Sequence, residues 1–165
     1  VLRQLEQNDA DLIFDYQSNK ENFMYVDMPI YKSVDEAENY ITRMNTGVAN
    51  NQWIIWAIAD RFTNKILGTI CIWNLSLEQL QGELGYGLYP GNVSKGIMTE
   101  ALNKVVEYGF NSMGLKVIEA CTNALNRKSI ALLEKNKFSK TSTFVEPSST
   151  GDSIDMVVYS IKTNH

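Results

Sequence analysis

The sequence predicts an α+β fold, a single domain in which helices flank a mixed, mostly antiparallel central sheet. The chain has 165 residues, of which 44% are hydrophobic and 21% charged, as expected for one domain spanning residues 1–165. Residues 53–59 and 66–73 are β-rich runs joined by a short polar segment, which indicates an antiparallel hairpin. A strand, a long amphipathic helix and another strand then follow between residues 83 and 122. This order requires a crossover connection within the same sheet.

The N-terminal part contains a short strand and three helices. Residues 1–5 have the pattern of a strand, and apolar residues then recur at helical spacing from Asp9 onward, which accommodates two short helices. Ser33 and Glu36 have the S-x-x-E spacing of a capping box, so a longer helix is expected to begin after Ser33. In and around the predicted hairpin we expect three tryptophans to belong to the core, namely Trp53, Trp56 and Trp73.

The remaining elements alternate between strands and helices. We expect strands at residues 83–88, 117–122, 141–145 and 155–161, and helices at residues 95–112 and 127–137. The long helix carries an apolar face, and Gly114 follows it as a C-terminal stop. The Pro/Ser/Gly-rich link at residues 146–153 is too short to divide the chain into two domains.

The composition excludes several classes of function. A net charge of −4 and a pI near 5.0 argue against a nucleic-acid partner. No apolar run approaches the ~20 residues of a membrane span, so no membrane partner is expected. The single histidine is the terminal His165, which makes histidine-based catalysis unexpected. Cys71 and Cys121 lack metal-ligand spacing, which indicates reduced, buried thiols in a cytoplasmic protein and no metal site.

The segment from residue 83 to residue 101 carries the clearest chemical signal. Alternation along its strand places Glu83 on one face with two glycines, while a tyrosine and two leucines share the other face. The turn that follows opens a helix whose first amides, between Ser94 and Thr99, have no partner within the helix. These amides form an anion site suited to a pyrophosphate. The alternative is an ordinary helix N-terminus capped by Ser94.

Two known phosphate-binding loops do not fit this segment. Gly91 and Gly96 have the glycine spacing of a Walker loop, but Ile97 and Met98 stand where that loop requires Lys and Ser or Thr. Pro90 occupies the last position of the dinucleotide-binding fingerprint, where a small glycine or alanine is required. ATP, GTP and dinucleotides are therefore not indicated as ligands.

Four separated parts of the chain, in a fixed order, carry a resemblance to a known family. They are Leu67-Gly68-Thr69 with Glu83-Leu84-Gly85-Tyr86, Lys95-Gly96-Ile97-Met98-Thr99-Glu100-Ala101, Gly114-Leu115-Lys116-Val117-Ile118-Glu119-Ala120, and Asn126-Arg127-Lys128-Ser129 continuing to Phe138. Together they resemble the GNAT acyltransferase superfamily, and within it the branch of ribosomal-protein N-terminal (alanine/serine) acetyltransferases. The resemblance implies acetyl-CoA as the cosubstrate, an amine as the acceptor, and a sheet whose central strands splay apart at the acetyl-CoA site.

The resemblance also implies roles for individual residues. Backbone groups of Tyr86 and Leu88 would pair with the pantetheine arm of acetyl-CoA. Asn126 would approach the pantetheine and would also act as the N-cap of its helix. Ser129 would donate a proton to the departing sulfur, the alternative being a hydroxyl on the helix surface. The pyrophosphate would bind the amides of Ser94, Lys95, Gly96, Ile97, Met98 and Thr99.

Attack on a thioester requires a neutral amine, whereas an amine with a pKa of ~10.4 is mostly protonated at neutral pH. Glu83 is the candidate base, because a carboxylate beside glycines on a sheet face can be partly desolvated. The alternative is a solvated glutamate at a strand end. A strand amide between Tyr86 and Leu88 is the expected donor to the oxyanion. Residues 23–31 and 146–153 are expected to select the acceptor.

The chain departs from the family pattern at four positions. Val93 and Met98 replace a side-chain donor and a small residue in the pyrophosphate loop, Gly87 replaces a bulky aromatic, and Leu133 replaces a tyrosine that protonates the thiolate in many members. One function is acetyl transfer by direct attack in a ternary complex, onto a protein N-terminus or a small-molecule amine. The alternative is a catalytically weak acyl-CoA-binding module. A monomer and a homodimer are both compatible with the sequence.

Overall fold

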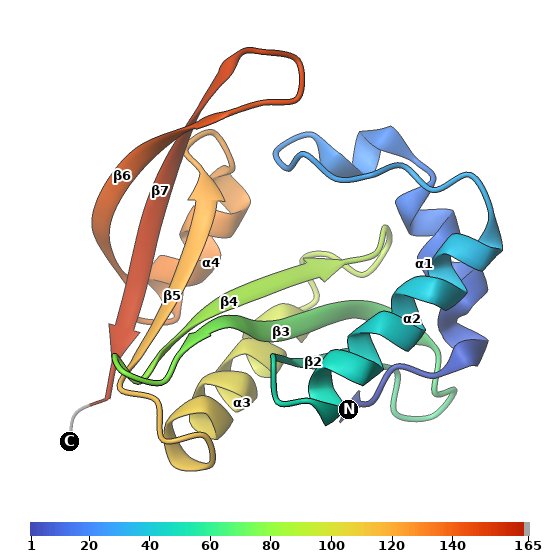
Figure 1. Cartoon of the computed structure of the whole chain (residues 1–165), viewed down its shortest axis with the longest axis horizontal. Coiled ribbons are helices and arrows are strands. Elements are labelled where there is room, and N and C mark those ends of the chain that lie inside the picture. Colours follow the sequence, from blue (N-terminus) through green and yellow to red (C-terminus); the bar gives the residue numbers. More distant parts are fainter. Residues whose placement is uncertain (164–165) are drawn as a thin grey trace.

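The structure is a computed structural model that describes residues 1–163, so the expectation for His165 lies outside the described residues. One sheet has the strand order β1-β2-β3-β4-β5-β7-β6 (Figure 1). Within residues 1–163 only β4 and β5 pair in parallel, which confirms the predicted mixed and mostly antiparallel sheet. The strands are β1 (Leu2–Arg3), β2 (Ile54–Ala59), β3 (Ile66–Ser76), β4 (Gln81–Leu88), β5 (Val117–Asn123), β6 (Ser139–Pro147) and β7 (Ser153–Lys162).

The helices lie where the sequence predicts them, with ends shifted by one or two residues. Ser33 caps α2 through the predicted capping box: its side chain accepts from the backbone of Glu36, and the Glu36 carboxylate accepts from the Ser33 N–H. The first strand is shorter than expected, and α3 begins at Ile97 instead of Lys95. The helices are α1 (Ala10–Gln17), α2 (Val34–Ala49), α3 (Ile97–Asn111) and α4 (Arg127–Lys135), with 3-10 turns η1 (Gln7–Asp9) and η2 (Lys20–Phe23).

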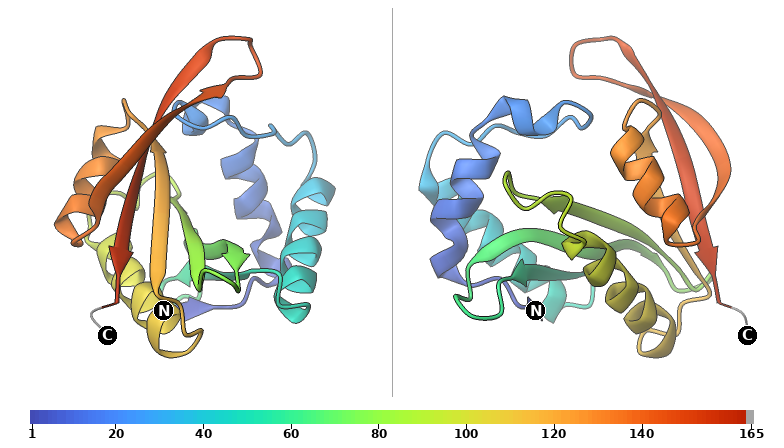
Figure 2. Two further views of the ribbon diagram at one scale, coloured as in Figure 1. Left: turned by 60° about the vertical axis from the view of Figure 1, so that its left-hand side comes forward. Right: turned by 180° about the vertical axis from the view of Figure 1, so that it is seen from behind.

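Helices cover both faces of the sheet, as Figure 2 shows. On one face α1 and α2 pack on β2 and β3 around buried residues that include Ile41 and Ala57. On the other face α3 and α4 enclose a second cluster that includes Ile72, Leu102 and Leu133. Residues on alternate positions of one strand therefore contact different helices, which is the basis for assigning side chains to a face below.

Strands β4 and β5 pair at only one end. Their parallel register joins residues 81–83 to residues 117–119. Beyond these positions β4 continues to pair with β3 up to Leu88, and β5 continues to pair with β7 up to Asn123. The two halves of the sheet therefore diverge (Figure 1). The β4–β5 opening is defined here as the stretch in which the later residues of these two strands are not paired with each other.

The expectation that all three tryptophans lie in the core is wrong for Trp73, whose side chain is 46% exposed. The antiparallel register pairs Trp73 with Glu83, so both side chains are on the same face of the sheet. On that face β4 carries Gly85, and the Trp73 indole lies beside this glycine without a large neighbour on β4. Trp53 and Trp56 are partly buried and pack against the two core clusters.

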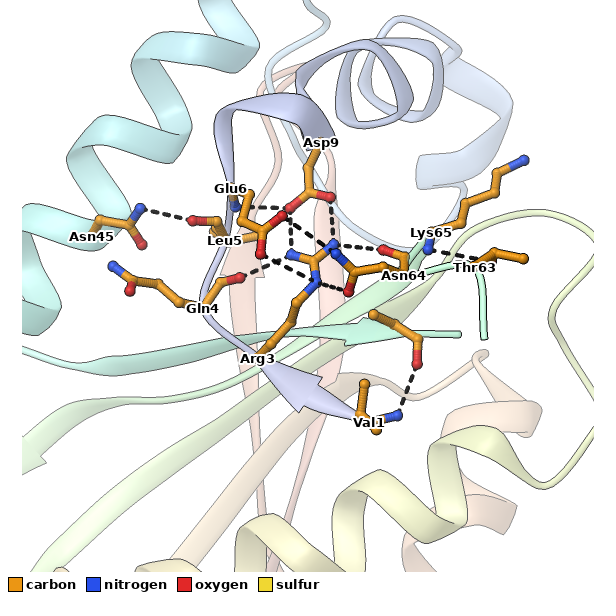
Figure 3. Close-up of polar contacts among 11 residues, drawn as sticks. Val1, Arg3, Gln4, Leu5, Glu6, Asp9, Asn45, Thr63, Asn64 and Lys65 are labelled. Carbon is orange, nitrogen blue, oxygen red and sulfur yellow. Dashed lines mark hydrogen bonds and ion pairs between the residues drawn. The ribbon is translucent and has the colours of Figure 1, made fainter. Parts of the chain in front are cut away.

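An ion pair anchors the N-terminal segment (Figure 3). Arg3 donates from Nη1 and Nη2 to the two carboxylate oxygens of Asp9 at 2.8 and 2.7 Å. The same guanidinium donates from Nε to Asn64 Oδ1 at 2.8 Å, in the turn between β2 and β3. The Asp9 carboxylate also accepts from the Glu6 N–H at 2.9 Å. Because the Arg3 and Asp9 side chains are only 15% and 5% exposed, water screens this pair poorly.

We expect Arg3→Met to lower the free energy of unfolding by about 3 kcal/mol, because it leaves the Asp9 carboxylate buried without its cation. Lys104→Met is the matched control: its pair with Glu107 is 68% and 59% exposed, so water screens it and its loss should change the stability little. Urea denaturation of both variants measures the difference. Equal destabilisation by the two substitutions would show that the Arg3–Asp9 pair does not anchor the segment.

Candidate active site

The β4–β5 opening leaves one edge of β4 without a strand partner. Tyr89, just after β4, donates its N–H to the Leu67 carbonyl of β3 at 2.8 Å. Backbone groups of successive strand residues point to opposite sides, so those of Leu88 and Tyr86 point away from β3 and toward the opening. In this stretch β5 does not pair with them. Backbone polar groups inside a sheet need a partner, and here an extended ligand could provide it.

The side chains of β4 divide between the two faces of the sheet. Tyr86 and the leucines two positions before and after it contact the cluster under α3 and α4. Glu83 is on the opposite face by alternation. On that face a Cβ added at Gly87 would lie 3.5 Å from the hydroxyl of Tyr16, which belongs to α1. The opening therefore connects two faces that carry different functional groups, as the alternation in the sequence predicts.

Glu83 lies among polar and acidic groups on the α1/α2 face. Asn74 donates from Nδ2 to Glu83 Oε2 at 3.3 Å. The thiol of Cys121 on β5 lies beside Glu83; burial, together with the carboxylates of Glu83, Glu119 and Glu146, raises the pKa of this thiol to about 12. The ion pairs found among residues 1–163 include none of these three carboxylates. The negative charge on this face is thus available to a cation.

The N-terminus of α4 lies against β4 on the other face. Asn126 is its N-cap, as predicted, and Asn126 Oδ1 accepts from the Ser129 N–H at 3.1 Å. The hydroxyl oxygens of Ser129 and Tyr86 are 2.7 Å apart and share a hydrogen bond. Ser129 is half-buried, so it is not an unconstrained hydroxyl on the helix surface. Leu133, one turn further along α4, is fully buried.

The turn between β4 and α3 contains left-handed backbone at Gly91, Ser94 and Gly96, with φ of 83°, 65° and 76°. Gly96 is the N-cap of α3, and no side chain caps this helix. The alternative considered from the sequence, a helix N-terminus capped by Ser94, is therefore wrong, because Ser94 lies two residues before the N-cap. The first amides of α3, in residues 97–99, remain without a partner within the helix. An added Cβ at Gly91 or Gly96 would meet nothing within 4 Å, so open space adjoins these amides.

The fold brings the hydroxyls of Tyr86 and Ser129 together at the β4–β5 opening, with the Glu83 carboxylate at the paired end of the opening and unpaired amides at the start of α3. Among residues 1–163 no group of three His, Cys, Asp or Glu side chains is arranged to hold a metal ion. In the same part of the chain no helix combines the length and hydropathy needed to cross a membrane. The arrangement can bind an extended ligand that ends in an anionic group, and it can accept and donate protons on opposite faces of one strand.

Sequence reasoning missed several side chains near these groups. Trp73 and Asn74 flank Glu83 from β3, and the register of the β3–β4 hairpin is the signal that would have placed Trp73 there. Cys121 and the Tyr86 hydroxyl could not be found in this way, because their contacts join segments far apart in the chain. The sequence assigned Tyr86 to the site through its backbone alone.

Comparison with known proteins places the chain in a family. The model of the acetyltransferase (GNAT) domain matches residues 1–139. The chain is 32% identical over 162 residues to the uncharacterized N-acetyltransferase YoaA of Bacillus subtilis, and the alignment covers 98% of this chain and 92% of YoaA. Both matches include the β4–β5 opening and the start of α4.

Solved structures share the fold at lower identity. The ribosomal-protein-S5-alanine acetyltransferase of Vibrio fischeri has a TM-score of 0.85 and 21% identity, covering 99% of this chain and 92% of the other. The spermidine N-acetyltransferase of Vibrio cholerae, solved in complex with CoA and spermine, has a TM-score of 0.84 and 22% identity, covering 98% and 94%. The chain belongs to the GNAT family and is an acetyl-CoA-dependent N-acetyltransferase.

Proposed function

We propose that this acetyltransferase transfers the acetyl group by direct attack of a primary amine on acetyl-CoA in a ternary complex. The acceptor is a protein N-terminus or a small-molecule amine. The observation that carries the proposal is the β4–β5 opening, which joins the face of Glu83 to the face of Ser129. A thioester held in the opening would meet the amine on the first face and release its thiolate on the second.

Main-chain groups would supply most of the acetyl-CoA site. The backbones of Tyr86 and Leu88 would pair with the pantetheine arm in place of β5. Asn126 would approach the same arm through its NH₂ group, since its Oδ1 already accepts from Ser129. The pyrophosphate would bind at the positive end of α3, where unpaired amides and the helix dipole both favour an anion. The residues proposed for this contact are Ser94, Lys95, Gly96, Ile97, Met98 and Thr99.

Glu83 is the proposed general base. Its Oε2 accepts from Asn74 and the Cys121 thiol is a second hydrogen-bonding neighbour, and the carboxylate would take a proton from the amine or from an intervening water. A lysine-like amine with a pKa of ~10.4 depends on such a base more than an α-amine with a pKa of ~8 does. A backbone N–H at the edge of β4 is the proposed donor to the oxyanion that develops on the thioester carbonyl.

The face around Glu83 favours a cationic acceptor. Glu119 and Glu146 add negative charge near Glu83, as their common effect on Cys121 indicates. The exposed indole of Trp73 lies on the same face, and an aromatic ring attracts an ammonium group. The two segments expected to select the acceptor also meet, since the Ser149 N–H donates to Asp27 Oδ2 at 2.9 Å.

Calorimetric titration with acetyl-CoA, followed by a thiol-release assay on a panel of amines, tests the proposed function. The panel contains peptides with free and with blocked N-termini, lysine peptides and polyamines. We expect saturable binding of acetyl-CoA and thiol release only when an acceptor amine is present. Binding without release from any amine would identify the acyl-CoA-binding module instead. An absence of acetyl-CoA binding would overturn both the acetyltransferase and the acyl-CoA-binding module.

Glu83→Gln should lower kcat by roughly 10²-fold, because the variant cannot accept a proton from the amine. The affinity for acetyl-CoA should not change, since Glu83 is on the face opposite α3 and α4. The loss should be larger with a lysine-like amine than with an α-amine. Glu107→Gln, at an exposed position of α3, is the control. An unchanged kcat in Glu83→Gln would remove this residue from the mechanism.

Both cysteines should resist alkylation in the native protein. Burial is the main cause that raises the pKa of the Cys71 thiol from 9.0 to about 11 and that of Cys121 to about 12. Because only the thiolate reacts, alkylation at about pH 8 should be roughly 10²-fold slower for Cys71 and 10³-fold slower for Cys121 than for an unperturbed thiol. Iodoacetamide labelling, with and without denaturant, measures this. Rapid labelling of native Cys121 would contradict its acidic, partly buried surroundings.

A further inference from the structure

We propose that the phenol of Tyr86, acting through the hydroxyl of Ser129, supplies the proton that the departing CoA thiolate takes up. The inference rests on the proposed function, because it assigns a role within the same site. Ser129 is the group that would reach the sulfur. Tyr86 acts through Ser129, so its role is to hold the serine hydroxyl in place and to replace the proton that the serine gives away.

The geometry behind this assignment is a hydrogen bond between two rigid elements. Tyr86 Oη and Ser129 Oγ are 2.7 Å apart, although the residues are 43 positions apart in the chain. Tyr86 is held by the pairing of β4 with β3. Ser129 is held in the first turn of α4, where its N–H donates to Asn126 Oδ1 at 3.1 Å. The two hydroxyls therefore meet at the β4–β5 opening, on the face of α3 and α4.

The reaction fixes the direction of this hydrogen bond. Ser129 can give its proton to sulfur only if it does not give that proton to Tyr86, so Tyr86 must donate and Ser129 Oγ must accept. Burial raises the pKa of the Tyr86 phenol, which therefore carries its proton throughout the neutral range. The hydrogen bonds found among residues 1–163 give the Tyr86 hydroxyl no partner besides Ser129.

Acidity explains why the serine needs the phenol. An alkyl hydroxyl is a far weaker acid than a phenol, so the serine can give its proton to sulfur only if the phenol replaces that proton in the same step. As the S–H bond forms, the Ser129 O–H bond breaks, and the Tyr86 proton restores it. The Tyr86 phenolate then takes a proton from solvent. An acceptor that starts as an ammonium loses two protons, the first through Glu83 before attack and the second from the newly acetylated nitrogen. One of them balances the proton given to sulfur, the other is released to solvent, and no alkoxide persists.

The placement also keeps the proton donor away from the proton acceptor. Tyr86 and Glu83 belong to the same strand but point to opposite faces of the sheet. The phenol therefore cannot protonate the amine that Glu83 activates. Leu133, one turn beyond Ser129 on α4, presents only methyl groups and offers no competing proton donor.

Tyr86→Phe, Ser129→Ala and the double variant test this inference. We expect each to lower kcat by roughly 10²-fold with KM for acetyl-CoA unchanged, and the double variant to be no slower than either single one. Tyr159→Phe is the matched control. Tyr159, on β7, donates a hydrogen bond from its phenol to Glu134 Oε1 of α4 at 2.8 Å. The control therefore also removes a hydrogen bond between a strand tyrosine and α4, but one that lies outside the site. It should lower the stability and leave kcat unchanged.

A second donor separates proton supply from packing. The acetyl thioester of thiophenol releases a thiolate that is stable without a proton, so the variants should use this donor as well as the wild type does. A deficit that persists with it, or additive losses in the double variant, would overturn the inference. Should Tyr86→Phe fail to fold, the Ser129→Ala comparison of the two donors decides. If the wild type is active and Tyr86→Phe is equally active, this inference is overturned and the proposed function stands. If the wild type itself is inactive, the proposed function and this inference are both overturned.

Discussion

The candidate site depends on one gap in the sheet, where the later residues of β4 and β5 do not pair with each other. Past Glu83 and Glu119 each strand keeps one neighbour, β3 or β7, and loses the other. Polar backbone groups within a sheet are costly to leave unpaired, so the edge of β4 is stable only with water or a ligand beside it. A ligand that carries amide groups along an extended chain satisfies such an edge in the way a strand does. In the proposed site, the gap in pairing would thus favour an extended donor whatever side chains surround it.

The alternation of β4 then separates the chemistry of the site. The odd-numbered residues of β4, which include Glu83, face α1 and α2, where further carboxylates lie near Cys121. The even-numbered residues face α3 and α4, and one of them, Tyr86, shares a hydrogen bond with Ser129 on α4. Because the sheet lies between its two faces, the side chains on one face do not contact those on the other. Bond formation and bond cleavage at the thioester would therefore occur on opposite sides of the sheet, with a proton acceptor on one side and proton donors on the other.

Local patterns in the sequence predicted the elements well, because hydrophobic period, the capping box at Ser33 and the stop at Gly114 are local properties. The features that failed depend on tertiary context. Trp73 is exposed because hairpin register, and not hydropathy, decides its face. Ser94 does not cap α3, because the turn uses left-handed backbone that places the cap at Gly96. The divergence of β4 from β5 leaves no periodic pattern in the sequence and was predicted only from the resemblance to the family. The contact between Tyr86 and Ser129 joins residues 43 positions apart, which no local pattern can predict.

The departures from the family pattern at the start of α3 and in the turn before it are compatible with the anion site proposed there. Met98 is only 7% exposed and packs into the core under α3, so its side chain does not occupy the space beside the helix end. Val93 lies in the turn before the helix and provides no cap. The amides of residues 97–99 point along the helix axis whatever side chains they carry, and the left-handed backbone of Gly96 directs the chain into the helix without covering them. A binding site made of main-chain donors would thus not depend on the side chains of the family motif.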